Sequence, residues 1–431
     1  MTDDGAVTLS ISPSGAALDT VLRMRVAGCA SGAIVSLATW QLDASGRRWS
    51  ASAKFVADES GVVDTTSDAP LTGTYEGIDP MALVWSMTRE DRAPAGMRLP
   101  LLGPAELHVT AQAGAGPVVE SSIQRARHPA GVTRTVIEAP GVVGVLFHPD
   151  LGGPHPGVML LGGSEGGLHE IDAALLAVHG FSVLALAYFG TEGVPRSLVD
   201  LPLESFGDAV DLLLANPAVR GTRVGILGGS RGGEAALLAG AMFPHVGAVV
   251  STVGSGLMTG GISHAPGLLD ILRADVGSWT WRGRRLPYMR YAVDRDLIDQ
   301  VESGGPVELA RAFRPDLASR HDVAVATIPV ERIQGPVLLL SADDDRSWPS
   351  AHLSEIAAQS LARHRHPFPF AHVRYADAGH LIAPPPYGPT ESVVPGPGVR
   401  FAMGGTPAAT SGARADAWRR TIEWFAEHLP G

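Results

Sequence analysis

The second part of the chain alternates short, continuously apolar runs with helix-length amphipathic segments, and this alternation constrains the fold most strongly. The apolar runs are residues 157–161, 181–187, 223–227, 246–251 and 336–340. Apolar residues at helical spacing lie between them, in residues 168–179, 203–214 and 231–243. Strands that are apolar on both faces belong to a mostly parallel sheet with helices on both sides. We therefore expect an α/β domain over residues 126–431.

Two segments interrupt this alternation. Residues 256–330 lie between two expected strands and contain Trp279, Trp281 and Arg282. We expect this insertion to form either a cap over a site or a surface excursion whose tryptophans pack it against the domain. Residues 384–405 are rich in proline and glycine, which indicates a loop. The alternation ends in residues 416–429, whose apolar residues recur at helical spacing and predict a packing helix.

The first part of the chain has a different pattern. Short alternating runs are separated by turn-forming residues, which is typical of a β-sandwich. No cluster of titratable residues stands out there, so we expect a structural or docking module of the immunoglobulin-like type over residues 1–125. The runs are residues 22–26, 33–42, 49–55 and 105–111.

Composition excludes several function classes. With 33 basic and 44 acidic side chains the net charge is −11, which argues against a nucleic-acid or anionic-membrane surface and favours a small-molecule substrate. No run of about 18 apolar residues predicts a membrane span. Cys29 is the only cysteine, so an intramolecular disulfide and a cysteine-based metal cluster are both excluded. The acidic residues at the N-terminus do not resemble a secretory signal, and we expect a cytoplasmic protein.

The sequence Gly228-Gly229-Ser230-Arg231-Gly232 matches G-x-S-x-G, the strand-to-helix turn that exposes a nucleophilic serine. In a chain with 52 glycines such a match carries little weight alone. A second copy occurs at residues 162–166, where Ser164 is the central serine, and both copies follow an apolar run and precede a helical segment. Either serine is a candidate nucleophile, and the remaining alternative is that both segments are simple tight turns.

Chain order distinguishes the two copies. In α/β-hydrolases a glycine-rich oxyanion turn comes first and the nucleophile follows it. This order predicts Ser230 as the nucleophile, because the earlier copy then supplies the oxyanion turn. The backbone N–H groups of Ser164, Glu165 and Arg231 are the expected oxyanion donors.

The other two catalytic groups are expected after the later strands. Three adjacent carboxylates follow the run at residues 336–340, and Asp345 precedes an apolar residue and a proline at the usual spacing, with Asp344 as the alternative. His380 lies in a loop after a predicted strand at residues 372–375. An imidazole there can take the serine proton and return it to a leaving group, while the aspartate fixes its tautomer. No metal ligand set is predicted.

Several segments resemble one family, the acyl-CoA thioesterases and bile acid-CoA:amino acid N-acyltransferases. The segment at residues 73–87, which begins Gly-Thr-Tyr-Glu-Gly-Ile-Asp-Pro-Met, resembles its N-terminal signature, and Gly-Ser-Arg-Gly-Gly-Glu at residues 229–234 resembles its nucleophile motif. Further matching segments are residues 162–170, 184–189, 328–332 and 378–387. The resemblance implies an immunoglobulin-like domain followed by an α/β-hydrolase domain.

The resemblance also implies roles. It assigns the nucleophile to Ser230, the acid to Asp345 and the base to His380. Because the amino-acid-transferring branch carries cysteine at the nucleophile position, serine favours transfer of the acyl group to water. The expected reaction is hydrolysis of an acyl thioester on coenzyme A or a carrier, with coenzyme A as part of the substrate and no separate cofactor. Ala383 departs from the family, which usually has glutamate there.

Alternatives to this function remain. The acyl group can pass to an amine or alcohol, the substrate can be an oxygen ester or lactone, or the fold can serve as a binding module without turnover. Arg282, with Arg284 and Arg285, is a candidate contact for the phosphates of coenzyme A, together with the neighbouring Trp279 and Trp281. A solvated charged loop is the alternative for these arginines. Chain length of the acyl group and oligomeric state are not predicted.

Overall fold

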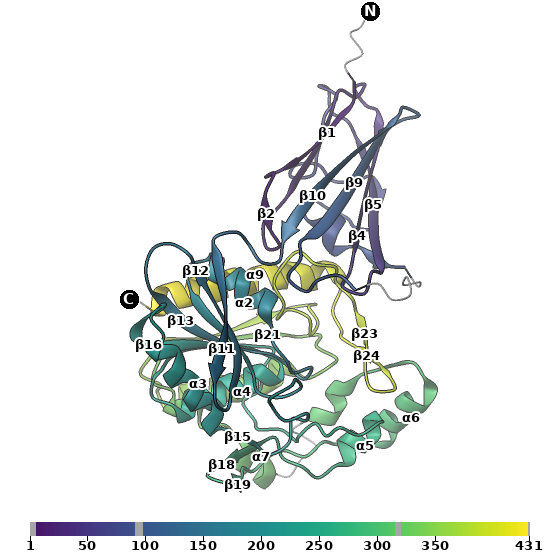
Figure 1. Cartoon of the computed structure of the whole chain (residues 1–431). Helices are drawn as coiled ribbons and strands as arrows, with labels where there is room; N and C mark the ends of the chain where they lie inside the picture. The colour runs from purple at the N-terminus through teal and green to yellow at the C-terminus, as the bar shows by residue number, and fades with distance from the viewer. Residues whose placement is uncertain (1–5, 91–97, 315–319, 430–431) are drawn as a thin grey trace, which may run out of the picture. The chain divides into compact units, whose positions relative to one another are not determined.

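A computed structural model describes residues 6–90, 98–314 and 320–429 (Figure 1). Residues 1–5, which include the acidic N-terminal side chains, and residues 315–319 of the insertion lie outside the described residues. The chain divides into two compact units, Met1–Ala130 with Pro385–Glu391 and Gly131–Pro384 with Ser392–Gly431. The division falls five residues later than the boundary expected at residue 125, and a segment expected in the second domain joins the first.

The transfer of residues 385–391 to the first unit has a physical cause. The Thr390 N–H donates a hydrogen bond to the Trp85 carbonyl oxygen at 3.0 Å. Glu391 lies 3.6 Å from the Arg89 guanidinium, and Tyr387 packs against the apolar core of this unit. These contacts fix the segment to the sandwich, although the chain around it belongs to the other unit.

The first unit is a β-sandwich, as the alternating runs predict. One sheet has the order β1 (Thr8–Ser12), β3 (Arg23–Ala27), β6 (Val63–Asp64). The other has the order β2 (Ala16–Ala17), β10 (Val118–Ala126), β9 (Ala105–Ala113), β4 (Ile34–Leu42), β5 (Arg48–Val56), β7 (Thr72–Gly73), with β8 (Thr88–Arg89) also paired to β5. Alternate residues of both sheets, such as Met24 and Phe55, meet in one core, which a short helix α1 (Ala82–Trp85) completes.

The second unit is built on an eight-stranded, mostly parallel sheet, which makes it an α/β-hydrolase domain. Its order is β11 (Val132–Ala139), β12 (Val142–Pro149), β14 (Ser182–Ala187), β13 (His155–Leu161), β16 (Val219–Gly229), β17 (Val246–Thr252), β21 (Val337–Ala342), β22 (Phe370–Tyr375). β12 runs antiparallel to β11 and to β14, and the pairs from β14 to β22 are parallel. The carboxyl ends of the parallel strands therefore share one edge, where catalytic loops gather in such sheets.

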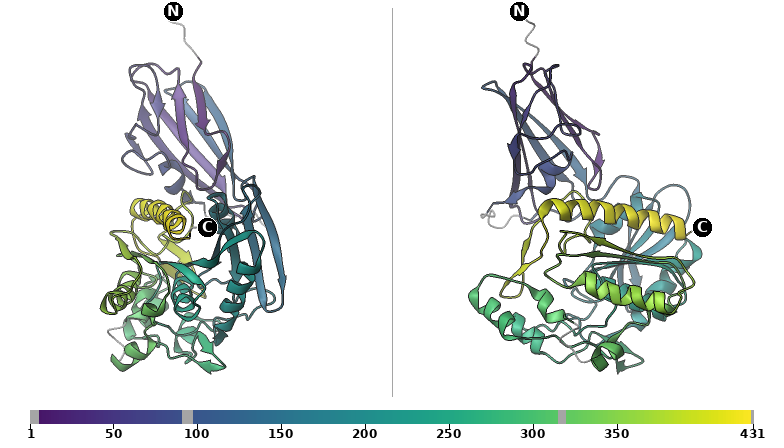
Figure 2. Two further views of the ribbon diagram at one scale, coloured as in Figure 1. Left: turned by 90° about the vertical axis from the view of Figure 1, so that its left-hand side faces the viewer. Right: turned by 180° about the vertical axis from the view of Figure 1, so that it is seen from behind.

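Helices cover both faces of this sheet. Figures 1 and 2 show α2 (Glu170–Val178) and α9 (Pro407–His428) on one face. The other face carries α3 (Glu204–Ala215), α4 (Arg231–Met242) and α8 (Ser350–Arg363). In the described parts of the chain, no helix is both long and apolar enough to cross a membrane.

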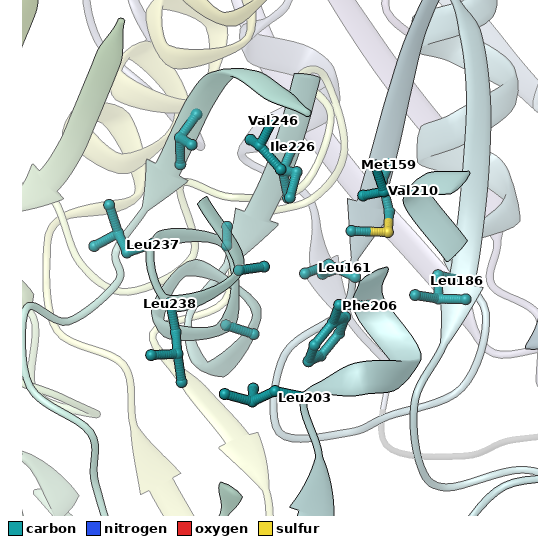
Figure 3. Packing of buried hydrophobic residues seen from close by; sticks show 14 of the residues in the cluster. Met159, Leu161, Leu186, Leu203, Phe206, Val210, Ile226, Leu237, Leu238 and Val246 are labelled. Atoms are coloured by element: carbon teal, nitrogen blue, oxygen red, sulfur yellow. The ribbon is translucent and has the colours of Figure 1, made fainter. Parts of the chain in front are cut away.

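The core beneath α3 and α4 fixes the two elements that later carry the site. Figure 3 shows Phe206 of α3 beside Leu161, near the end of β13, and Leu237 and Leu238 on α4. These side chains are at most 2% exposed, and burial of each stabilises the fold by about 1.5–3 kcal/mol. The end of β13 and the start of α4 are thereby held in a fixed relation.

The insertion at residues 256–330 is a series of short elements. They are α5 (Leu268–Arg273), β18 (Trp279–Trp281), β19 (Arg284–Arg285), α6 (Arg295–Ser303), β20 (Pro306–Val307), η1 (Leu309–Phe313), α7 (Arg320–Ala326) and η3 (Val330–Arg332), and β18 also pairs with β15 (Leu201–Pro202). The segment at residues 384–405 is not only the loop that we expected. It contains the hairpin β23 (Val393–Pro395) and β24 (Arg400–Ala402), and β24 pairs with β20 of the insertion.

Candidate active site

Ser230 occupies a strained turn between β16 and α4. Its backbone has φ 54° and ψ −118°, a combination that non-glycine residues rarely adopt. The turn is held because the Ser230 N–H donates to the Thr252 carbonyl oxygen at 2.9 Å. Strand and helix approach so closely that a Cβ on Gly228 would lie 2.0 Å from the Gly232 carbonyl oxygen. The glycines of the motif are therefore required by contact, and they leave the serine hydroxyl at the edge of the sheet.

His380 lies between the serine and a carboxylate. Its Nε2 is 3.1 Å from Ser230 Oγ, and its Nδ1 is 2.8 Å from Asp345 Oδ2. The histidine loop is fixed from both sides, since the His380 N–H donates to the Met403 carbonyl oxygen and the Gly379 N–H donates to Thr410 Oγ1. Three residues that lie far apart in the chain thus form one hydrogen-bonded series, which can move a proton from the hydroxyl to the imidazole.

The structure places Asp345, and neither of its two neighbours, against the histidine. The side chain of Asp345 is 1% exposed, and its Oδ1 accepts hydrogen bonds from the Ser347 and Trp348 N–H groups at 3.1 and 3.0 Å. Asp343 pairs with Arg374, and Asp344 accepts from Arg346 and from the Gly405 N–H. The two backbone donors turn one oxygen of Asp345 inward and leave the other for the imidazole.

Charges around His380 favour its protonated form. Burial lowers the pKa of the imidazole, but the carboxylates of Asp345 and Glu165 outweigh burial and raise this pKa above its usual value. An imidazolium that forms when the serine loses its proton is therefore stabilised where it arises.

The turn after β13 faces the serine. Ser164 and Glu165 lie on this exposed turn, which is anchored by the Tyr188 hydroxyl donating to the Gly162 carbonyl oxygen at 2.7 Å. Within the described residues, the N–H groups of Ser164 and Arg231 donate to no other group, so they are available to an oxyanion. The Ser164 hydroxyl bonds to no described histidine, in contrast to Ser230.

A cavity of about 440 Å³ opens over these groups. Ser230, His380 and the turn at residues 162–165 form its polar side. Its apolar lining includes Leu160, Leu227, Val253, Leu309, Leu381, Ala383, Val394, Phe401, Met403 and Trp418. A largely apolar cavity with a few convergent polar groups is the usual form of a site for a small organic substrate.

Two family profiles match the chain. The profile described as "BAAT / Acyl-CoA thioester hydrolase C terminal" matches residues 201–431, and "Acyl-CoA thioester hydrolase/BAAT N-terminal region" matches residues 19–139. The chain belongs to the acyl-CoA thioester hydrolase/BAAT family. It is an enzyme of the thioesterase-like hydrolase type.

Curated relatives match over nearly the whole chain. Human acyl-coenzyme A thioesterase 1 is 32% identical over 99% of this chain and 98% of its own length. Human acyl-coenzyme A thioesterase 2, mitochondrial, is 31% identical over 99% of this chain and 85% of its own. The mouse peroxisomal succinyl-coenzyme A thioesterase is 30% identical over 98% and 97%.

In this family member the expected substrate contacts in the insertion are not at the cavity. Trp279 is 1% exposed, and its Nε1 donates to Glu234 Oε1 at 2.7 Å in the core. Trp281 packs edge-on against Phe243, and the guanidinium of Arg282 lies over the Trp281 ring. The structure places none of these three predicted substrate contacts at the cavity: the two tryptophans pack the insertion onto the domain, and Arg282 is exposed.

The neighbouring arginines do not line the cavity either. Arg285 forms a bidentate pair with Asp200, and Arg284 is exposed on β19. Arg231 itself is buried, with its side chain paired to Glu234 at 2.9 Å, so only its backbone N–H faces the serine. Burial raises the pKa of Glu234, and the adjacent Arg231 opposes this rise.

Sequence reasoning missed much of the cavity wall. The hairpin β23–β24 contributes Val394 and Phe401, and the insertion contributes Leu309. The apolar residues on both sides of Gly396-Pro397-Gly398 were the available signal for a hairpin. No group of three or more His, Cys, Asp or Glu side chains suited to a metal ion is found within the described residues.

Proposed function

We propose that this chain hydrolyses an acyl thioester, on coenzyme A or on a carrier, through an acyl-enzyme on Ser230. The observation that carries the proposal is the hydrogen-bonded series from Ser230 through His380 to Asp345 at the edge of an apolar cavity. Relatives named acyl-coenzyme A thioesterases support the thioester as the bond that is broken. Coenzyme A would enter as part of the substrate, and the reaction requires no separate cofactor.

In the first half-reaction Ser230 Oγ attacks the thioester carbonyl carbon while His380 Nε2 takes the hydroxyl proton. The carbonyl oxygen becomes an oxyanion, and the free N–H groups of Ser164 and Arg231 are the proposed donors to it, whereas the Glu165 N–H bonds to its own carboxylate. Removal of one such donor typically costs about 10²- to 10³-fold in rate. When the carbon–sulfur bond breaks, the imidazolium returns the proton to the thiolate. The products are a free thiol and an ester on Ser230.

In the second half-reaction water attacks the ester. His380 takes a proton from the water and then gives it to Ser230 Oγ as the acyl–oxygen bond breaks, which restores the enzyme and releases the acid. Asp345 holds the imidazole in the tautomer with hydrogen on Nδ1 throughout both steps. An amine or alcohol in place of water would give an amide or a new ester by the same sequence.

One experiment tests the reaction and its acceptor together. The purified chain is incubated with acyl-CoA esters of graded chain length, with and without amines and alcohols, while thiol release and product mass are followed. We expect the free acid as the product and no activity in Ser230→Ala. An amide or ester product would replace hydrolysis by transfer, and absence of thiol release with every acyl chain would reject both.

A fluorophosphonate probe tests the nucleophile separately. We expect the wild-type chain to be labelled covalently, the label to map to Ser230, and Ser230→Ala to remain unlabelled. Labelling combined with hydrolysis of oxygen esters or lactones, but not of thioesters, would keep the nucleophile and change the substrate. A cytoplasmic location also stays a prediction, which imaging of the tagged chain in its native cells tests.

A further inference from the structure

Three charged side chains at the cavity have no part in the proposed proton transfers. Glu165 lies on the turn after β13, and His169 and Asp172 lie at the start of α2. Glu165 Oε1 is 2.9 Å from His169 Nε2, and His169 Nδ1 is 3.6 Å from Asp172 Oδ2. Burial lowers the pKa of His169, but the two carboxylates outweigh burial and raise this pKa to about 10. His169 is thus a cation at neutral pH, held between two anions.

The carboxylate of Glu165 also holds its own turn. Glu165 Oε1 accepts a hydrogen bond from the Gly163 N–H at 3.1 Å. Gly163 directly precedes Ser164, whose N–H is a proposed oxyanion donor. Because Oε1 is bound both by this N–H and by the His169 cation, the turn is tied to the first turn of α2. A bond between a backbone N–H and an ionised group is stronger than a neutral one.

The ionic series continues to the histidine loop. Arg414 of α9 is 4% exposed, and its Nε donates to the Leu381 carbonyl oxygen at 2.9 Å, one residue after His380. Burial lowers the pKa of Arg414 to about 10, while attraction to Asp172 opposes this. Charges of alternating sign therefore run from Glu165 through His169 and Asp172 to Arg414. The guanidinium of Arg414 in turn holds the carbonyl group of the residue that follows the proposed base.

We propose that Glu165 is a positioning residue, whose carboxylate holds the oxyanion turn through the Gly163 N–H and sets a negative charge opposite His380. The inference rests on the proposed function, in which Ser230 is acylated. Two effects should follow from the one side chain. The hydrogen bond fixes where the Ser164 N–H points, and the charge stabilises the imidazolium. A purely structural role would predict neither a change in rate nor a shift in its pH dependence.

The groups that face His380 come from three elements. Asp345 follows β21, Glu165 follows β13, and Ser230 precedes α4; the Arg414 guanidinium of α9 lies behind the Leu381 carbonyl group. Both Asp345 and Glu165 raise the pKa of His380. Although 60% of the Glu165 side chain is exposed and water screens its charge, removal of this charge should lower the pKa of His380.

The test compares two substitutions at Glu165. Glu165→Gln removes the charge but keeps an oxygen that can accept the Gly163 N–H, whereas Glu165→Ala removes both. The second-order rate of labelling by an uncharged fluorophosphonate is measured from pH 5 to 9 for each variant. Glu192→Gln serves as the control, because it removes the same charge from an exposed side chain that does not line the cavity. Thermal unfolding identifies any variant that does not fold.

We expect the acid limb of Glu165→Gln to move to lower pH, with a plateau within about threefold of wild type. Glu165→Ala should show the same shift and a plateau at least about tenfold lower, because the turn is released. If Glu165→Ala does not fold, the shift in Glu165→Gln decides. Glu192→Gln should match wild type in both respects.

Any of three results would overturn the inference. They are an unshifted acid limb in Glu165→Gln, an unchanged plateau in a folded Glu165→Ala, and faster labelling of Glu165→Ala than of wild type. Faster labelling would mean that the carboxylate obstructs the site. The outcome is separable from the proposed function, since labelling of Ser230 needs no thioester. If labelling shows the expected shifts but no acyl-CoA releases thiol, the thioesterase function is rejected and the positioning role of Glu165 is kept. If the wild-type chain is not labelled at all, both the proposed function and the role of Glu165 are rejected.

Discussion

Replacement of Asp345 by asparagine should nearly abolish activity without unfolding the chain, and the structure shows why. Oδ1 of Asp345 already accepts two backbone N–H groups, from Ser347 and Trp348. If the amide nitrogen of an asparagine took this position, its N–H groups would face the two backbone N–H groups. Each donor left unpaired in this way would cost about 1–3 kcal/mol. The amide oxygen must therefore occupy that position, and the amide nitrogen must face His380 Nδ1.

This orientation reverses the histidine tautomer. With an N–H donor opposite, Nδ1 has to accept, so the ring hydrogen moves to Nε2, which then donates to Ser230 Oγ across 3.1 Å. An imidazole in that form cannot take the serine proton. The same substitution in serine proteases lowers kcat by about 10⁴-fold, which corresponds to about 5 kcal/mol of transition-state stabilisation. We expect a loss of this order.

The assay is the rate of fluorophosphonate labelling, with thiol release from an acyl-CoA as a second readout. Asp343→Asn is the matched control: the same chemical change, two residues earlier, in a carboxylate that pairs with Arg374 away from the cavity. Asp344→Asn tests the alternative acid. A folded Asp345→Asn that keeps more than about a tenth of the wild-type rate would refute the tautomer argument. A larger loss of rate in Asp344→Asn than in Asp345→Asn would assign the role of the catalytic acid to Asp344 instead.

Three further outcomes are expected. Because the pKa of His380 is raised and the neutral ring is the active form, kcat/KM should fall as pH decreases. The midpoint of this acid limb should lie above histidine's usual pKa of about 6.5, and a midpoint at or below that value would contradict the charge argument. Gly232→Ala should lower both the melting temperature and the labelling rate, because the new Cβ would lie 2.4 Å from the Leu161 carbonyl oxygen. If calorimetry and labelling give wild-type values for this variant, the close packing is contradicted. Trp279→Phe should lower the free energy of unfolding in denaturant by about 1–3 kcal/mol, because Glu234 loses a buried hydrogen-bond donor. KM should stay unchanged, and a raised KM would indicate that Trp279 contacts the substrate.

Much of the fold follows from periodicity. The predicted runs at residues 157–161 and 246–251 lie within β13 and β17, because a strand covered by helices on both faces must be apolar throughout. The pair β11 and β12 was not predicted. Only one residue of β11 is buried and its apolar residues alternate weakly, so they give little signal, and only the turn at Pro140-Gly141 marks the hairpin.

The polar part of the site was predictable because its chemistry fixes both residue type and order along the chain. The cavity wall was not, since Leu309 and Phe401 are ordinary apolar residues that become lining only when β20 pairs with β24. Trp279 shows the opposite case. A tryptophan in an insertion suggests a substrate contact, but whether its N–H faces a ligand or a buried carboxylate depends on tertiary packing that local sequence does not encode.

The two G-x-S-x-G segments competed for one role in the sequence, yet the structure makes them neighbours in one site. Gly232, from the later copy, packs so closely that a Cβ would lie 2.5 Å from the Gly162 carbonyl oxygen of the earlier copy. The first turn of α4 therefore rests directly on the turn that carries Ser164. In the proposed mechanism the distance between nucleophile and oxyanion donors is set by this glycine contact on one side and by Glu165 on the other. The glycines that make the motif unspecific in sequence are the residues that allow its two copies to act together.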